Sequence, residues 1–335
     1  MCARNLRLEQ GPAHRQIPGD AAGPSPSKKT ALLAFLFLGV IWGSNFIFMK
    51  WAAELISPAQ IVLLRAVFGF LPVFIYALAQ GTLRWQHVRH THHFVVMSLL
   101  AIAIYYFAFA KGIALLPSSI AGLLSGAIPL FTFLCAWLFL REEHIDLPKA
   151  AGVALGFLGV LLIARPWLGS GGIDVAGVAY MIAGSVSVGC SFVYARKFIT
   201  PLDLPAAALT TYQIGLAMVF LLVVTDLDGI NAVFRDTRAW IGLVLGLGLC
   251  GTGLAYLAYY YVVANLGAVA ASGVTYIPPV VALLIGAVLV GDEIHPLTYV
   301  AMILILSGVA ALQFGTLRVG AHTANKQPVR DGGHD

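Results

Sequence analysis

The chain has few charged residues for its length and keeps most of them out of its long apolar runs. Of 335 residues, 10% are charged and 59% are hydrophobic, whereas a soluble domain has roughly 25% charged residues. The connections between the apolar runs are short, so no soluble domain fits between them. These scarcities exclude a soluble enzyme and indicate an integral membrane protein.

Carboxylates are missing from the interiors of the apolar runs, because every aspartate and glutamate falls in a tail, in a loop or at the end of a run. Proton relays and sites for cationic solutes use intramembrane carboxylates. The interior charges here are basic, which favours anionic, zwitterionic or neutral solutes over strong cations. The runs also lack paired acids and lack a nucleophile beside a base, so we expect no enzyme activity.

Cysteine is scarce as well. Three of the four cysteines, Cys135, Cys190 and Cys250, fall inside apolar runs, where they behave as small hydrophobes. We therefore expect no disulfide framework, no metal and no cofactor. The net charge is +5, but the basic residues form no stripe with interleaved aromatics, so we expect no nucleic-acid partner. The expected partners are a small-molecule substrate and the lipid bilayer, with the protein a monomer or a homodimer.

The apolar residues form runs of about 20, the number that crosses about 30 Å of hydrocarbon. Residues 1–30 contain no apolar core of a signal peptide, and we interpret them as a disordered cytoplasmic tail. Residues 317–335 form a second cytoplasmic tail. We expect an all-α integral membrane protein with ten transmembrane helices, at 31–50, 59–79, 94–115, 118–140, 148–165, 175–195, 205–225, 239–263, 269–290 and 297–316.

The distribution of Lys and Arg predicts the orientation. With the N-terminus inside, the outer side holds only Lys50, Arg165, Arg235 and Arg238. The inner side holds Arg4, Arg7, Arg15, Lys28, Lys29, Arg84, Arg89, Arg141, Lys149, Arg196, Lys197, Arg318, Lys326 and Arg330. Both termini are therefore expected in the cytoplasm.

Two stretches of the chain repeat each other. Alanine, proline and glutamate of 121–143 recur at the same spacing in 271–293, and Gly43, Phe46 and Lys50 align with Gly189, Phe192 and Arg196. We predict five-helix halves at 31–166 and 173–316. Because five is odd, the halves enter the membrane in opposite senses and form an inverted repeat, as in many secondary transporters.

The residues that carry a family resemblance follow one another through both halves. They are Trp42 to Phe46, Arg65, Pro117 to Ser119, Ala121, Pro129 and Glu143, and then Ala271, Pro279 and Glu293. In this order they resemble the EamA family of the drug/metabolite transporter superfamily. The resemblance implies a ten-helix exporter of the bacterial inner membrane, with alternating access to a central cavity. It also implies that the substrates are amino acids or related metabolites and drugs. Lys111 departs from the family pattern.

Candidate residues of the cavity lie on helix faces, at spacings of three, four and seven. Polar and aromatic groups there can line a site or simply pack between helices. Arg65 and Lys111 can contact substrate or snorkel. Tyr259 and Tyr261 are assigned to an interfacial belt instead. The candidates are Trp42, Asn45, Phe46, Met49, Arg65, Tyr105, Phe109, Lys111, Tyr256, Tyr260, Ser272, Thr275 and Tyr276.

Three prolines fall inside predicted helices. Pro129, Pro278 and Pro279 remove backbone hydrogen bonds, so we interpret them either as hinges beside the cavity or as ordinary packing residues. The repeat would bring Pro129 and Pro279 together at the midplane. Glu143 and Glu293 are expected to have structural roles at the ends of their helices.

Two further motifs are set aside. Gly246 to Gly251 matches GxGxxG, but it lies in an apolar run with no preceding strand, which argues against a nucleotide site. Histidines at 87, 90, 92 and 93 could bind a transition metal or could form a solvated loop. The alternatives to a carrier are a channel-like facilitator or a lipid flippase of the same topology.

Overall fold

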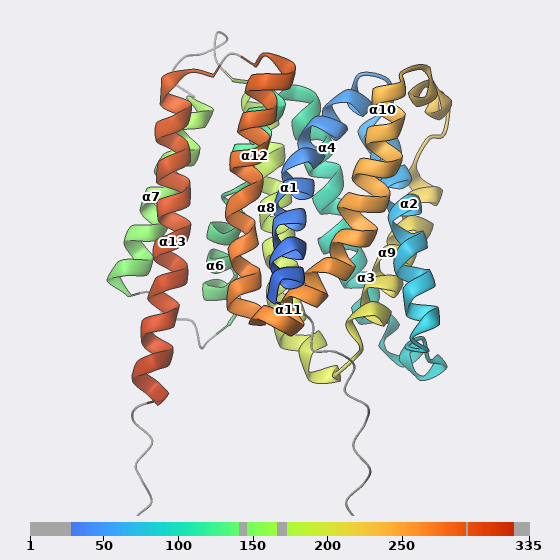
Figure 1. Ribbon diagram of the computed structural model, residues 1–335, viewed down its shortest axis with the longest axis horizontal. Coiled ribbons are helices and arrows are strands. Elements are labelled where there is room, and N and C mark those ends of the chain that lie inside the picture. Colours follow the sequence, from blue (N-terminus) through green and yellow to red (C-terminus); the bar gives the residue numbers. More distant parts are fainter. Residues whose placement is uncertain (1–27, 141–145, 166–172, 293, 325–335) are drawn as a thin grey trace, which may run out of the picture.

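The computed structural model describes residues 28–140, 146–165, 173–292 and 294–324, and in these ranges the chain is all-helical (Figure 1). The side chains of 28, 268–270, 272 and 313–324 lie outside the described part. The predicted tails fall largely outside it too, as do Glu143 and Glu293. The all-α prediction is confirmed for the described residues.

The first part of the chain forms seven α-helices with two irregular helical segments between them. These are α1 (Lys28–Ala53), α2 (Pro58–Ala79), η1 (Trp85–His90), α3 (Thr91–Ser98), η2 (Leu99–Ile104), α4 (Tyr105–Leu115), α5 (Ser118–Ser125), α6 (Ile128–Phe139) and α7 (Leu147–Ala164).

The second part contains more 3-10 and π segments. It comprises α8 (Val175–Tyr194), η4 (Ala195–Ile199), η5 (Thr200–Leu202), α9 (Ala206–Val224), η6 (Ile230–Arg235), α10 (Thr237–Ile241), η7 (Gly242–Leu254), α11 (Ala255–Ser272), η8 (Gly273–Tyr276), α12 (Ile277–Ile285), η9 (Gly286–Val290) and α13 (Pro296–Ala324).

Consecutive segments combine into rods that are long and apolar enough to cross a bilayer. Within the described ranges, nine such rods occur, and the apolar part of α13, Pro296–Leu312, is shorter. The rods begin within nine residues of the predicted runs. The molecule is thus a multi-pass membrane protein.

Local signals explain where several helices begin. The Ser57 hydroxyl accepts a hydrogen bond from the backbone amide of Gln60, and the Gln60 Oε1 atom accepts one from the backbone amide of Ser57. Pro58 opens α2. Asp146 caps α7 through the Lys149 amide at 2.9 Å, and Asp174 caps α8 through the Gly177 amide at 3.0 Å. The side chains before the helices therefore satisfy amides that the helix itself leaves unpaired.

Glycines set how closely the helices pack, as their GxxxG spacing predicts. On α7, Gly152 and Gly156 lie against Gly308 of α13, where an added Cβ would meet backbone atoms within 3.0 Å. The helices α7 and α13 lie at one edge of the bundle, and α2 and α9 lie at the opposite edge (Figure 1). On α5, Gly122 faces Ala282 of α12.

The predicted hinge prolines lie where helices restart. α5 ends at Ser125, and Pro129 is the second residue of α6; Pro278 and Pro279 lie in the first turn of α12, after the 3-10 segment η8. In a first turn, the missing proline N–H breaks no helical hydrogen bond. The ring of Pro279 lies against Gly126, so the two breaks lie side by side.

Candidate substrate site

Arg65 is a buried cation inside the helical bundle. Its side chain belongs to α2 and is 6% exposed. The Nε atom donates to Thr252 Oγ1 at 2.9 Å, and the guanidinium carbon lies 3.7 Å from the centroid of the Tyr106 ring. The ion pairs of the described residues include none to Arg65. Neutral groups therefore anchor the guanidinium, and none of the carboxylates in the described part of the chain neutralises its charge.

Small residues bring Thr252 to Arg65. Gly69 lies one turn after Arg65 on α2, and a Cβ there would collide with the Thr252 side chain. Thr252 lies in η7 and also donates to the carbonyl of Leu247 at 2.9 Å. The glycine-rich π segment and Gly69 together let α2 and η7 approach closely enough for this hydrogen bond.

Aromatic side chains from α1, α4 and α11 form a continuous set of contacts around Arg65, which we call the aromatic belt. Neighbouring ring centroids lie between 4.6 and 6.4 Å apart, and Tyr256 packs against the buried cluster that contains Tyr106. The set begins and ends on α1, at Trp42 and Phe46, which are four residues apart. The belt consists of Trp42, Phe46, Tyr105, Tyr106, Phe109, Tyr256, Tyr259 and Tyr260.

Asn45 lies between the two α1 members of the belt. It is 6% exposed, and its Oδ1 is buried without a hydrogen-bond partner among the described residues. This oxygen approaches Gly251, where any side chain would collide with it. Asn45 and Arg65 thus contact consecutive residues of η7, Gly251 and Thr252. A buried acceptor without a donor is costly, so this oxygen is a natural contact for a ligand.

The remaining predicted residues lie around the belt or apart from it. Met49 is buried in the core one turn beyond Phe46. Lys111 is half-buried on α4, about 240° around the helix from Tyr105 at 100° per residue. Thr275 and Tyr276 are half-buried in η8, and the Tyr276 hydroxyl has no hydrogen-bond partner among the described residues. The side chain of Ser272 lies outside the described part.

Three functional candidates were missed in the sequence. Tyr106 stacks on Arg65, Thr252 anchors it, and Thr210 of α9 hydrogen-bonds to Tyr260. Tyr259, assigned from the sequence to an interfacial belt, contacts Trp42 and Tyr260. A hydroxyl inside an apolar run was the available signal for Thr210 and Thr252.

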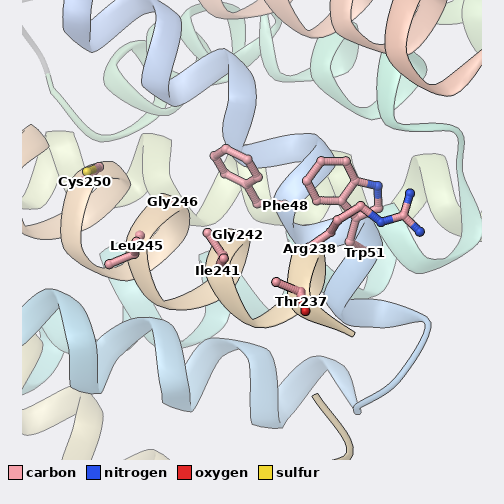
Figure 2. A pocket seen from close by; sticks show the side chains of 9 residues that line it. All are labelled: Phe48, Trp51, Thr237, Arg238, Ile241, Gly242, Leu245, Gly246 and Cys250. Carbon is pink, nitrogen blue, oxygen red and sulfur yellow. The ribbon is translucent and has the colours of Figure 1, made fainter. Parts of the chain in front are cut away.

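A separate open groove of about 440 Å³ lies on the surface between α1, α10 and η7 (Figure 2). Its walls are mainly apolar and include Phe48, Trp51, Ile241 and Leu245, with Arg238 near one end. No predicted cavity residue lines this groove, so it is distinct from the aromatic belt.

The histidines of η1 and α3 pair with tyrosines. His87 lies 3.2 Å from the Tyr212 hydroxyl, and His93 Nδ1 lies 2.8 Å from the Tyr194 hydroxyl. Among the described residues, no group of three or more His, Cys, Asp or Glu side chains is placed to hold a metal ion. The histidines therefore link α3 and η1 to α8 and α9.

The arrangement around Arg65 suits a small solute with a carboxylate. The guanidinium can donate to an anion while it remains stacked on Tyr106. Asn45 offers an acceptor, and the belt offers flat apolar surface with hydroxyls at its edges.

Comparison with known proteins shows which family has this architecture. The model of the EamA-like transporter family matches residues 29–165 and 175–313. The chain is 25% identical to "Uncharacterized inner membrane transporter YedA" of Escherichia coli K12, over 84% of this chain and 90% of that protein. It is 24% identical to "Probable amino-acid metabolite efflux pump" of Salmonella typhimurium LT2, over 86% of this chain and 96% of that protein.

Two further similarities extend across most of the chain. An "Uncharacterized transporter" of Archaeoglobus fulgidus is 24% identical over 84% of this chain and 97% of its own length. A solved structure, "Crystal structure of protein", superposes with a TM-score of 0.55 at 21% identity, over 88% of this chain and 99% of that one. At that identity the likeness concerns the fold alone.

Proposed function

The chain belongs to the EamA-like transporter family, and we propose that it is a secondary transporter that exports small carboxylate-bearing metabolites. The substrates would be amino acids or related zwitterionic, anionic or aromatic solutes, with drugs among them. The family and the transporter names of its relatives point to transport rather than to enzyme catalysis. The relative from Escherichia coli is named as an inner membrane protein, and we propose that membrane for this chain.

The proposed topology has ten spans in two inverted five-helix halves, with both termini in the cytoplasm. The two family matches support two halves, and the excess of Lys and Arg on one side supports the orientation. In such proteins the substrate lies near the midplane, between the halves. The aromatic belt takes its residues from both matched stretches, which fits a central site that opens to alternate sides.

The observation that carries the substrate class is the environment of Arg65. A guanidinium on a side chain only 6% exposed is expensive to bury, and the described residues supply it with a hydroxyl and an aromatic face. A substrate carboxylate would supply the missing negative charge. Asn45 Oδ1 would accept a hydrogen bond from the amine of a zwitterionic solute, and the belt would pack against its side chain.

Export of an anion needs no coupling ion in this scheme. An inside-negative membrane potential favours the outward movement of one negative charge by about 2.3 kcal/mol per 100 mV. A site that selects anions is therefore compatible with export driven by the potential and by the solute gradient.

A thermal-shift assay on purified protein tests the substrate class. We expect phenylalanine and phenylacetate to raise the unfolding temperature, and phenylalanine amide and tetramethylammonium to leave it nearly unchanged. The shift should be lost in Arg65→Gln, reduced in Trp42→Ala and retained in Arg238→Gln, whose side chain is 74% exposed. A larger shift with tetramethylammonium than with phenylacetate would refute the proposed preference.

The alternatives are a channel-like facilitator and a lipid flippase of the same topology. A channel would let a solute leak down its gradient at rates far above those of a carrier. A flippase would move a fluorescent phospholipid between leaflets in reconstituted vesicles. The buried and tightly packed surroundings of Arg65 favour a carrier for small solutes over either alternative.

A further inference from the structure

The connection between α4 and α5 is held by two charged side chains from other helices. The ammonium group of Lys50 on α1 donates hydrogen bonds to the carbonyls of Ile113 and Leu116, at 3.1 and 2.9 Å. Asp292, which follows η9, accepts at Oδ2 from the Ser119 amide at 3.2 Å and from the Ser119 hydroxyl at 2.7 Å. The Ser118 hydroxyl lies 3.4 Å from the same oxygen.

Each charge is placed where a helix end attracts it. The carbonyls at the C-terminal end of α4 carry partial negative charge, and Lys50 meets them; the amides that open α5 carry partial positive charge, and Asp292 meets them. Lys50 also interacts electrostatically with the carboxylates of Asp292 and Glu54. Contacts of this kind between ionised groups and hydrogen-bonding partners are among the stronger hydrogen bonds in proteins.

The two side chains come from the two matched stretches of the chain. Lys50 lies in the first stretch and Asp292 in the second, so Asp292 fastens one half to the other. The contact depends on Gly286, because a Cβ there would collide with Ser119 and with the Asp292 carboxylate. The segment η9 continues α12. Because Gly286 has no side chain, η9 packs directly against the start of α5.

The residue that corresponds to Lys50 in the second half has a different environment. Arg196 aligns with Lys50 at an offset of 146 residues, but Arg196 is exposed whereas Lys50 is half-buried. The two ends of the bundle are thus not equivalent in this structure, although the halves repeat each other. Such a difference is expected when a transporter closes one end at a time.

We propose that Lys50 and Asp292 form a latch that holds this end of the bundle closed, and that both contacts must break before the end opens. The latch lies at the end away from Lys28, where α1 starts. It rests on the proposed function in that a transporter must open this end during its cycle. The latch itself needs no substrate, so it can be tested separately.

Cysteine accessibility tests the latch in protein whose four native cysteines are replaced and which is reconstituted in nanodiscs. The probe is Ser125→Cys, a near-isosteric change on α5 at a side chain that is 9% exposed. The control probe is Ser191→Cys on α8, at a side chain that is 1% exposed. A charged maleimide labels each probe in the background chain, in Lys50→Met, in Asp292→Ala and in the double variant.

We expect the Ser125→Cys probe to react about ten-fold faster in the double variant, and the Ser191→Cys probe to react no faster. Lys50→Arg keeps a donor at position 50, so the Ser125→Cys probe should react as slowly as in the background chain. An unchanged rate at Ser125→Cys overturns the latch. An equal rise at both probes also overturns it, because the residues would then merely stabilise the fold.

The outcome is separable from that of the substrate proposal. The thermal shift with phenylacetate is measured on the same variants, and it depends on Arg65 rather than on the latch. A shift that is absent from every variant, together with the selective rise in labelling, would refute the substrate class and leave the latch supported. The reverse pattern would refute the latch alone.

Discussion

Arg65 and Tyr106 form a cation–π contact, with the guanidinium carbon 3.7 Å from the ring centroid. Because the pair is buried, we expect Tyr106→Leu to lower the free energy of unfolding by about 2 kcal/mol. Tyr106→Phe keeps the ring face on Arg65 and removes only the hydroxyl group, so it should cost less, about 1 kcal/mol. Unfolding in detergent measures both variants. Equal losses would show that the ring face contributes nothing.

The close approach of Asn45 to Gly251 predicts that no side chain is tolerated at position 251. Gly251→Ala should destabilise the protein by about 1–3 kcal/mol through overpacking. Gly273→Ala is the control, since its nearest neighbour atom would lie 3.8 Å away. Adding Asn45→Ala to Gly251→Ala should recover part of the loss. The contact is refuted if the two glycine variants unfold at the same temperature.

The packing of α7 on α13 predicts a contrast between two other glycines. A methyl group at Gly308 would meet the Gly152 carbonyl and the Gly156 backbone, which cannot move aside. A methyl group at Gly242 would meet the Phe48 ring at 3.0 Å, and that ring can rotate. Gly308→Ala should therefore lower the unfolding temperature more than Gly242→Ala. The opposite order would contradict this packing.

Asp236 predicts a pH effect outside the spans. Hydrogen bonds from the amides of Ala239 and then Arg238 lower the pKa of its carboxyl group. A lowered folded-state pKa stabilises the protein above the unfolded value of about 4, and this stabilisation is lost as the pH falls through the folded value. The unfolding temperature of wild type relative to Asp236→Asn should be higher at pH 6 than at pH 3. A difference independent of pH would contradict this.

The helical rods could be predicted from the sequence because each depends on local composition. Apolar runs place α2 at 59–79, against the observed Pro58–Ala79, and 118–140 corresponds to α5 and α6 together. The break between α5 and α6 was predicted only as a proline kink at Pro129. The helix instead stops at Ser125, where Gly126 packs against Pro279 of a helix about 150 residues away. Periodicity within one run carries no information about that partner.

The candidate site shows the same limit. Arg65 and Asn45 stand out as polar residues in apolar runs, and the aromatic residues with them share helix faces. Tyr106 was missed because it lies about 100° around α4 from Tyr105, off the face that the spacing selects. Thr252 was missed because its role depends on Gly69 of another helix. Such contacts between helices follow only from the packed structure.

The proposed transport depends above all on Arg65 binding the substrate carboxylate. Transport of labelled phenylalanine and of its amide into proteoliposomes tests this role most directly, in wild type, Arg65→Gln and Arg238→Gln. Losing a charge-assisted hydrogen bond costs about 1.5–3 kcal/mol, so phenylalanine transport by Arg65→Gln should fall about ten-fold or more, with Arg238→Gln unchanged. Transport of the amide should be slow in all three. Phenylalanine transport by Arg65→Gln at the wild-type rate would contradict this role.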